Sequence, residues 1–125
     1  MEKPDVPKVV EAEQFVLRDE HGVVRAWLGL SSVGPALQLC DRKGVPRISI
    51  ELQNDKPCIG VMRQDGNPLL SFKQLDDGST ILGLSRNNRT PALLIIGEDG
   101  KDVQVALCRS DGEPVWVHIG DGEAG

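Results

Sequence analysis

Acidic residues beside glycine are the first candidates for chemistry in this sequence, because carboxylate oxygens are the ligands that calcium prefers. Four such clusters occur: Asp76-Asp77-Gly78, Glu98-Asp99-Gly100, Asp111-Gly112-Glu113 and Asp121-Gly122-Glu123. None has the D-x-[DN]-x-[DN]-G spacing that supplies alternate ligands around one ion, and none belongs to the glycine-rich nonapeptides of calcium β-rolls. We therefore predict no cofactor and no built metal site, and leave weak calcium binding at these turns open.

Two further carboxylates, Asp19 and Asp41, recur at the same place before a glycine turn and could serve as acids or ligands. A short acid in that position also accepts backbone N–H groups and stabilises the turn, which we favour because the later units lack the acid. The two histidines, His21 and His118, have no zinc-ligand spacing with the cysteines. No serine lies in a nucleophile elbow. The sequence thus predicts no catalytic residue and no enzymatic activity.

Charge and composition exclude several classes of partner. The 125 residues carry a net charge of −5 with acids and bases interspersed, and aromatic residues make up only 3%. Phosphate binding needs a basic face and base stacking needs aromatic platforms, so nucleic acid is not expected. No stretch is apolar enough to span a membrane, and the N-terminus, MEKPDVPK, lacks an apolar signal-peptide region. Three cysteines, Cys40, Cys58 and Cys108, predict reduced thiols in the cytoplasm.

The elements that must position these residues come from a repeat. FVLRDEHGVVRAWLGL (15–30) is followed 22 residues later by LQLCDRKGVPRISIEL (37–52), and glycine or asparagine falls at 22, 44, 66 and 88, with a slip to Gly112. Apolar residues alternate within each unit, which is the period of strands and not of helices. Five hairpin units predict an all-β antiparallel meander of about ten strands in one domain, residues 9–120, between flexible segments 1–8 and 121–125.

Two-residue turns, the commonest hairpin connection, would fix the register of these strands. Within units, turns at His21-Gly22, Lys43-Gly44, Asp65-Gly66, Asn87-Asn88 and Asp111-Gly112 place Leu17 opposite Ala26, Leu39 opposite Ile48, Val61 opposite Leu70, Ile81 opposite Leu94 and Leu107 opposite Trp116. Between units, Asn54-Asp55 and Asp99-Gly100 place Ile50 opposite Ile59 and Leu94 opposite Val105, while Val33-Gly34 and Asp77-Gly78 complete the set. Asp19 and Asp41 would then lie opposite Val24 and Pro46.

An open ten-stranded sheet would leave one apolar face in water, so the meander must close on itself or pair with another copy. We favour a closed or nearly closed barrel, with an oligomer of curved sheets as the next choice. A two-sheet solenoid is less consistent, because solenoid coils stack in parallel and do not use Asp-Gly hairpin turns.

The pattern F/L-x-L-x-D-x-x-G-x-x-R-x-x-L/I, which runs from Phe15 to Leu28 and again from Leu37 to Ile50, resembles a repeat found in many poorly characterised bacterial proteins. The resemblance extends over about residues 10–119 and weakens after the second unit, where Arg63 takes the place of the acid. It implies a β-hairpin-repeat fold and no particular active site.

In this register, the last four strands are apolar on both faces, which means that something covers each face. The extra apolar residues are Leu82, Leu84, Leu93, Ile95, Ala106 and Val117. We predict that they form an interface with a second copy or another protein, in preference to cover by the N-terminal segment through Val9 and Val10. The predicted function is a non-enzymatic structural or protein-interaction module that self-associates. The alternative is a small barrel that carries an apolar ligand, lined by Phe15, Leu37, Ile59 and Phe72.

Overall fold

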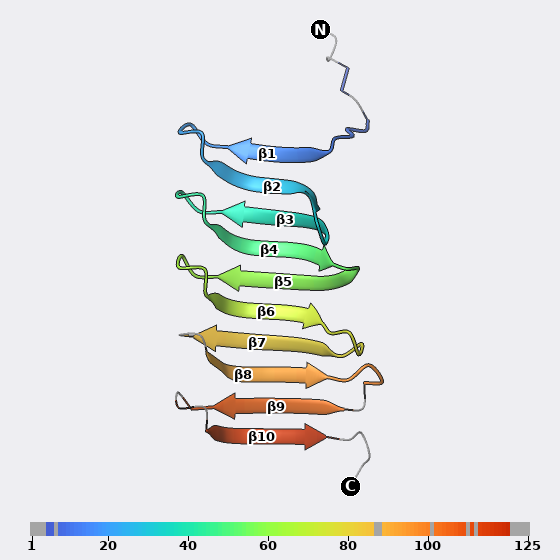
Figure 1. Ribbon diagram of the computed structural model, residues 1–125, viewed down its shortest axis with the longest axis vertical. Helices are drawn as coiled ribbons and strands as arrows, with labels where there is room; N and C mark the ends of the chain where they lie inside the picture. The colour runs from blue at the N-terminus through green and yellow to red at the C-terminus, as the bar shows by residue number, and fades with distance from the viewer. Residues whose placement is uncertain are drawn as a thin grey trace.

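The chain forms one antiparallel sheet of ten strands that follow each other in sequence order (Figure 1). The computed structural model describes residues 5–6, 8–86, 89–100, 102–109, 111 and 113–120, of which 114–120 as backbone only. The strands are β1 (Gln14–Arg18), β2 (Val24–Ser31), β3 (Gly34–Cys40), β4 (Pro46–Gln53), β5 (Lys56–Met62), β6 (Pro68–Gln74), β7 (Thr80–Arg86), β8 (Arg89–Ile96), β9 (Val103–Cys108) and β10 (Pro114–Gly120). No helix occurs in the described ranges. The predicted all-β meander is therefore confirmed.

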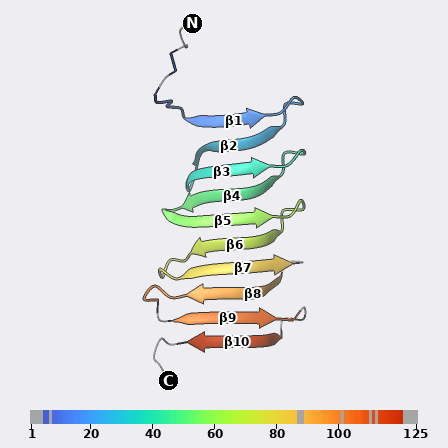
Figure 2. The same cartoon turned by 180° about the vertical axis from the view of Figure 1, so that it is seen from behind.

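The sheet is open, so the predicted barrel is wrong. β1 and β10 lie at opposite ends of the stack, each paired with only one neighbour, as both faces of the molecule show (Figure 2). Barrel closure requires strands that tilt and stagger steadily around the axis. Here successive cross-strand partners form one straight row that runs from Phe15 in β1 to His118 in β10 and includes one residue of every strand. The strands are therefore not staggered relative to one another.

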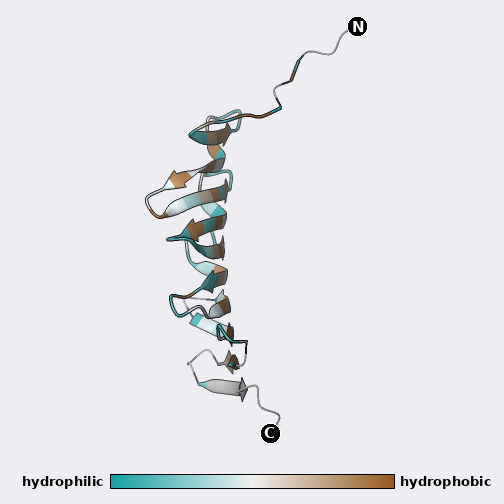
Figure 3. Ribbon diagram, turned by 90° about the vertical axis from the view of Figure 1, so that its right-hand side faces the viewer, coloured by the Kyte–Doolittle hydropathy of each residue, from teal (hydrophilic) through white to brown (hydrophobic). Residues whose placement is uncertain are grey.

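Nothing packs on either face of this sheet in the described part of the chain, and seen from the side it is a single layer (Figure 3). Among the residues whose side chains are described, no large one is fully buried, and the buried non-glycine residues are small: Ala36, Ser49 and Ser79. The strands are thus held together by backbone hydrogen bonds and by contacts between side chains on neighbouring strands. Each of these cross-strand contacts contributes modestly to stability. A single chain has no second layer to complete a hydrophobic core.

Turn chemistry differs at the two ends of the strands. The Asn54-Asp55 turn is the predicted two-residue turn, with positive φ at both residues (51° and 67°) and Gln53 paired with Lys56. In contrast, at the other end Gly22 N–H donates to the Asp19 carbonyl and Asp19 N–H donates to the Val23 carbonyl, each at a distance of 3.0 Å. This is a three-residue loop in which Gly22, at φ 78°, takes the left-handed position.

The predicted strand pairs at this end are nevertheless confirmed, because a bulge compensates for the longer loop. Leu17 pairs with Ala26 while Arg18 pairs with Val24, which leaves Arg25 as the extra residue. The pairs Leu39–Ile48, Val61–Leu70 and Leu107–Trp116 follow the same rule. The predicted partners of the two acids are wrong, since Val24 faces Arg18, and Pro46 faces Cys40.

In three other hairpins the register or the turn differs from the prediction. The β2–β3 turn is centred on Ser32-Val33 and not on Val33-Gly34, since Ser31 pairs with Gly34. The β6–β7 loop has three residues and no bulge, because Leu75 N–H bonds the Ser79 carbonyl, so Phe72 faces Leu82. In β7–β8, Ile81 faces Ile95 and not Leu94. The predicted loop residues Asn87 and Asn88 lie outside the described residues.

Candidate interaction surface

One face of the sheet carries two unbroken rows of apolar residues, and we call it the apolar face. The first row is Phe15, Leu28, Leu37, Ile50, Ile59, Phe72, Leu82, Leu94 and Val105; the second is Leu17, Ala26, Leu39, Ile48, Val61, Leu70, Leu84, Ala92 and Leu107. Each row crosses nine strands without a polar residue. Such a continuous apolar surface is far larger than the scattered exposed side chains of an ordinary monomer.

The apolar face is open to solvent in the isolated chain. Leu28 is 45% exposed, Ile50 48% and Leu84 48%, because each touches only its row neighbours and its own strand. Ten strands about 4.8 Å apart, each with about 20 Å of usable length, give a footprint of roughly 900 Å². That area matches the ~800 Å² that each partner buries in a stable protein–protein interface.

The six residues predicted as an interface do not share one face of the sheet, and their role in an interface stays a prediction. Leu82 and Leu84 belong to the apolar face, while Leu93 and Ala106 lie on the opposite face in the row of Gly83. Ile95 also lies on the opposite face, paired with Ile81, and Val117 pairs with Ala106 in the backbone register. The one-residue shifts in the β6–β7 and β7–β8 hairpins separate them, since one residue of slip exchanges the faces.

The N-terminal segment does not cover the apolar rows either. Val9 and Val10 are 70% and 65% exposed, and the segment extends away from the sheet beyond β1 (Figure 1). Among the described residues of this segment, Val9 and Val10 therefore do not provide the cover considered as an alternative to an interface.

The repeated D-x-x-G-x-x-R motif builds turns. Asp19 Oδ1 accepts the N–H groups of His21 and Val23 at 2.9 and 3.0 Å, and its other oxygen lies 3.7 Å from the Arg25 guanidinium. The bulged Arg25 in turn donates from Nε to the Cys40 carbonyl at 3.1 Å. The motif thus closes its own turn and fastens it to the next hairpin.

The second copy of the motif repeats these contacts. Asp41 Oδ1 accepts the N–H groups of Lys43 and Val45, and Arg47 Nε donates to the Met62 carbonyl at 2.7 Å. The Val45 N–H makes the largest contribution to lowering the pKa of Asp41, with further lowering by Lys43 and Arg47 against an opposing effect of desolvation. The structural role predicted for both acids is confirmed.

In later units the acid moves to the position before glycine and keeps a structural role. Asp65 accepts the Asn67 N–H, which lowers the pKa of Asp65, while the Ser79 hydroxyl and N–H lower the pKa of Asp77. Asp111 accepts the Glu113 N–H. Within the described ranges, no three His, Cys, Asp or Glu side chains gather as metal ligands.

The other reactive groups whose side chains are described do not come together in one site. Cys40, Cys58 and Cys108 are free, and burial raises the pKa of the Cys58 thiol, which keeps it protonated and weakly nucleophilic. His21 sits at an exposed tip, 3.5 Å from Glu20, and the side chain of His118 is outside the described atoms. Ser31 Oγ donates to the Gly34 carbonyl, which makes it part of a turn.

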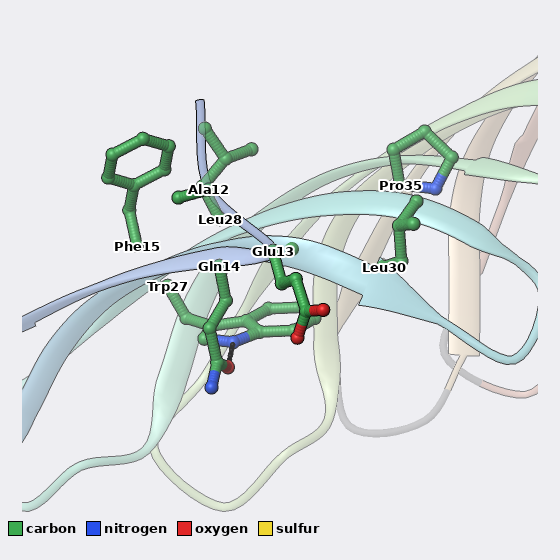
Figure 4. Close-up of a pocket in the computed structure, with 9 residues that line it drawn as sticks. Ala12, Glu13, Gln14, Phe15, Trp27, Leu28, Leu30 and Pro35 are labelled. Carbon is green, nitrogen blue, oxygen red and sulfur yellow. Dashed lines mark hydrogen bonds between the residues drawn. The ribbon is translucent and has the colours of Figure 1, made fainter. Parts of the chain in front are cut away.

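A hollow of about 770 Å³ lies at the β1 edge, where five-residue β1 covers only part of eight-residue β2 (Figure 4). Phe15 and Trp27 lie on opposite sides of the ribbon, and Trp27 Nε1 donates to Gln14 Oε1 at 3.0 Å. Glu13 is the one ionisable residue that lines it. The hollow opens around a sheet edge, and its described lining residues include no converging set of polar groups of the kind that active sites have.

Comparison with known proteins adds no assignment: no family model matches the chain, and a search of curated proteins finds no match. No helix among the described residues is long and apolar enough to cross a membrane. The apolar face is therefore the feature on which a functional argument can be built.

Proposed function

We propose that this protein is a non-enzymatic β-repeat structural module that assembles with further copies of itself through the apolar face. The observation that carries the proposal is the pair of apolar rows, which cross nine strands and stay uncovered in the single chain. We also propose that the chain is one of the bacterial hairpin-repeat proteins whose D-x-x-G-x-x-R pattern it resembles. The three unpaired thiols are consistent with the cytoplasm.

The energy available from this face is large enough to drive association. A footprint of roughly 900 Å², at about 25 cal/mol per Å² of apolar area, corresponds to about 20 kcal/mol per copy before losses. Loss of translational and rotational freedom costs an estimated 4–15 kcal/mol. The surplus favours an oligomer over a monomer that leaves the face in water.

A further copy of the chain suits the surface better than an unrelated partner. The rows of apolar side chains have the same spacing in every copy, so a further copy offers a matching surface, and side chains of packed sheets meet about 5 Å from each backbone. The opposite face suits solvent along the central strands, where small and polar residues such as Gln38, Ser49 and Ser71 succeed each other. A carrier of apolar ligands needs an enclosed interior, which this open sheet does not form.

Sedimentation equilibrium of the purified chain tests the proposal with two variants in β3. Leu39→Lys places a charge in the second apolar row, whereas Gln38→Lys places the same charge on the opposite face of the same strand. We expect an oligomer for the parent and for Gln38→Lys, and a large shift of Leu39→Lys toward the 13.6 kDa monomer.

Circular dichroism of each variant establishes that the sheet is retained, and a second lysine variant, Ile50→Lys, replaces Leu39→Lys if that chain does not fold. A parent chain that sediments as a monomer at all concentrations, or an oligomer that both apolar-face variants leave intact, would overturn the proposal.

A further inference from the structure

The charged side chains of this sheet are sorted to its two ends. All eight arginines lie at the end where β1–β2, β3–β4, β5–β6, β7–β8 and β9–β10 turn, on the left in Figure 1, and we call it the arginine end. The loops that join β4–β5, β6–β7 and β8–β9, together with Glu11 and Glu13 before β1, form the acidic end.

The two ends carry opposite net charge. Among the described residues from 11 to 113, the arginine end has nine basic and six acidic side chains, a net charge of +3. The acidic end has two basic and nine acidic side chains, a net charge of −7. A field of opposite sign at the two ends steers and orients any association between copies.

Two arginines of this end, Arg86 and Arg89, have no acidic partner among the described residues. Arg25 and Arg47 are used by their own turns, but Arg86 and Arg89 face each other as register partners across the β7–β8 hairpin. No carboxylate among the described residues pairs with either one. Like charges opposite each other destabilise a hairpin, unless an anion lies between them.

Negative charge of the matching kind is concentrated at the acidic end. Glu98 in the β8–β9 loop reaches back over the β6–β7 loop, since a Cβ at Gly78 would lie 2.7 Å from Glu98 Cδ. This brings Glu98 beside the loop that carries Asp76 and Asp77. Asp76 is paired with Lys56, and Glu98 forms no salt bridge with a basic side chain in the described part.

From this polarity, and resting on the proposed self-association, we infer that the arginine end of one copy lies against the acidic end of the next, and that three copies close a ring. The ring axis runs along the stack of strands, and the three apolar faces point inward. Turns alternate along the stack, so the β7–β8 hairpin of one copy is level with the gap between the β6–β7 and β8–β9 loops of its neighbour. Arg86 and Arg89 then enter between Asp76 and Glu98 of that neighbour.

The length of the strands favours three copies over four. Strands of about seven residues are about 23 Å long, so three sheets arranged as a triangle lie about 6–7 Å from the axis. Side chains of packed sheets meet about 5 Å from each backbone, half of the ~10 Å spacing, so a triangle is filled. Four sheets would leave the axis about 12 Å away and the interior empty.

The alternatives meet the charges less well. A face-to-face dimer about an axis parallel to the strands superposes arginine end on arginine end. A free polyanion would bind the arginine end alone and leave the acidic end unmatched. Contact between the arginine end of one copy and the acidic end of the next pairs the charges of both ends. It repeats a single heterologous interface around a closed ring.

Charge reversal tests the contact. We expect Arg86→Glu/Arg89→Glu and Asp76→Lys/Glu98→Lys each to weaken association at low salt at least tenfold, and the chain carrying all four changes to regain it. The parent should sediment near three times 13.6 kDa, and its association should weaken as NaCl is raised and screens the charged contact. Gln38→Glu/Ser71→Glu, which adds negative charge to the outer face, should change association little.

The outcomes separate this inference from the function on which it rests. An oligomer that Leu39→Lys disrupts but neither reversal weakens, or a parent that sediments as a dimer, would overturn the ring and leave the apolar-face assembly standing. A monomeric parent would overturn both. Retention of the parent on heparin, lost in Arg86→Glu/Arg89→Glu while the oligomer persists, would assign the arginine end to a polyanion and also refute the contact.

Discussion

Arg25 in β2 donates from Nε to the carbonyl oxygen of Cys40 in β3 over 3.1 Å, and the same contact recurs 22 residues later between Arg47 and Met62. Each arginine is also the extra residue of a bulge, so its side chain leaves the regular alternation and turns toward the neighbouring hairpin. The conspicuous repeat of the sequence is thereby explained as a device that joins hairpins into a stack.

Removal of this contact should destabilise the sheet. We expect Arg47→Ala to lower the free energy of unfolding by about 1–2 kcal/mol, because the Met62 carbonyl loses a charge-assisted donor. Arg47→Lys should recover little of the loss, since lysine lacks the Nε that meets the carbonyl. Urea denaturation measures the effect, with Arg42→Ala at the exposed tip of the same turn as the control. Equal midpoints for the Arg47 and Arg42 variants would contradict this role.

The strands can be predicted from the sequence because alternating apolar residues and turn residues repeat along it. The predicted pairing of residues is wrong where loop length or a bulge changes the register, because neither leaves a recognisable pattern in the sequence. In the first hairpin, the loop has one residue more than predicted, and the bulge restores the register that a two-residue turn would give. The prediction that Leu17 pairs with Ala26 is therefore correct although the predicted turn is not. The β6–β7 hairpin has the longer loop without the bulge, so nothing cancels and Leu82 changes face. Such a bulge depends on contacts across strands, which no single stretch of sequence encodes.

The candidate surface was foreseen only in part, for a related reason. Sequence alternation identified the apolar residues themselves, but the assumption of barrel closure treated the rows from Phe15 onward as an interior. Acidic and basic residues are interspersed along the sequence but are separated in the structure. The separation arises because the 22-residue period returns each arginine to the same end of the sheet. This separation of charge becomes visible only when the strands are placed side by side in the sheet.

Gly34 is required by a close approach between strands. Its φ is +145°, and a Cβ would lie 2.3 Å from the Leu52 carbonyl oxygen. We expect Gly34→Ala to cost at least about 2 kcal/mol of stability, because the left-handed backbone and the contact both resist a side chain. Gly60→Ala, whose Cβ would meet nothing within 4 Å, is the matched control. Thermal denaturation compares them, and equal transition temperatures would refute the requirement.

Acid should weaken the turns that depend on carboxylates. The Val45 N–H lowers the pKa of Asp41, and a lowered folded-state pKa means that its stabilisation is present above the ordinary aspartate pKa and is lost as pH falls below about 4. Asp41→Asn removes this titration and should flatten the loss of stability between about pH 4 and pH 2. Urea midpoints across that range measure the difference. Asp55→Asn, in the two-residue turn, is the control, and a parental pH profile in Asp41→Asn would count against the argument.

Trp27 reports on the attachment of the edge strand β1. Its ring covers Gly29, where a Cβ would lie 2.6 Å from Cζ2, and its Nε1 donates to Gln14 in β1. Gly29→Ala should push the ring aside and break that hydrogen bond, because a methyl group cannot share the space. In a Trp116→Phe background, we expect a red-shifted Trp27 emission and faster amide exchange in β1, which pairs with β2 alone. Gly60→Ala again serves as the control, and emission identical to the parent in Gly29→Ala would show that the ring does not hold β1.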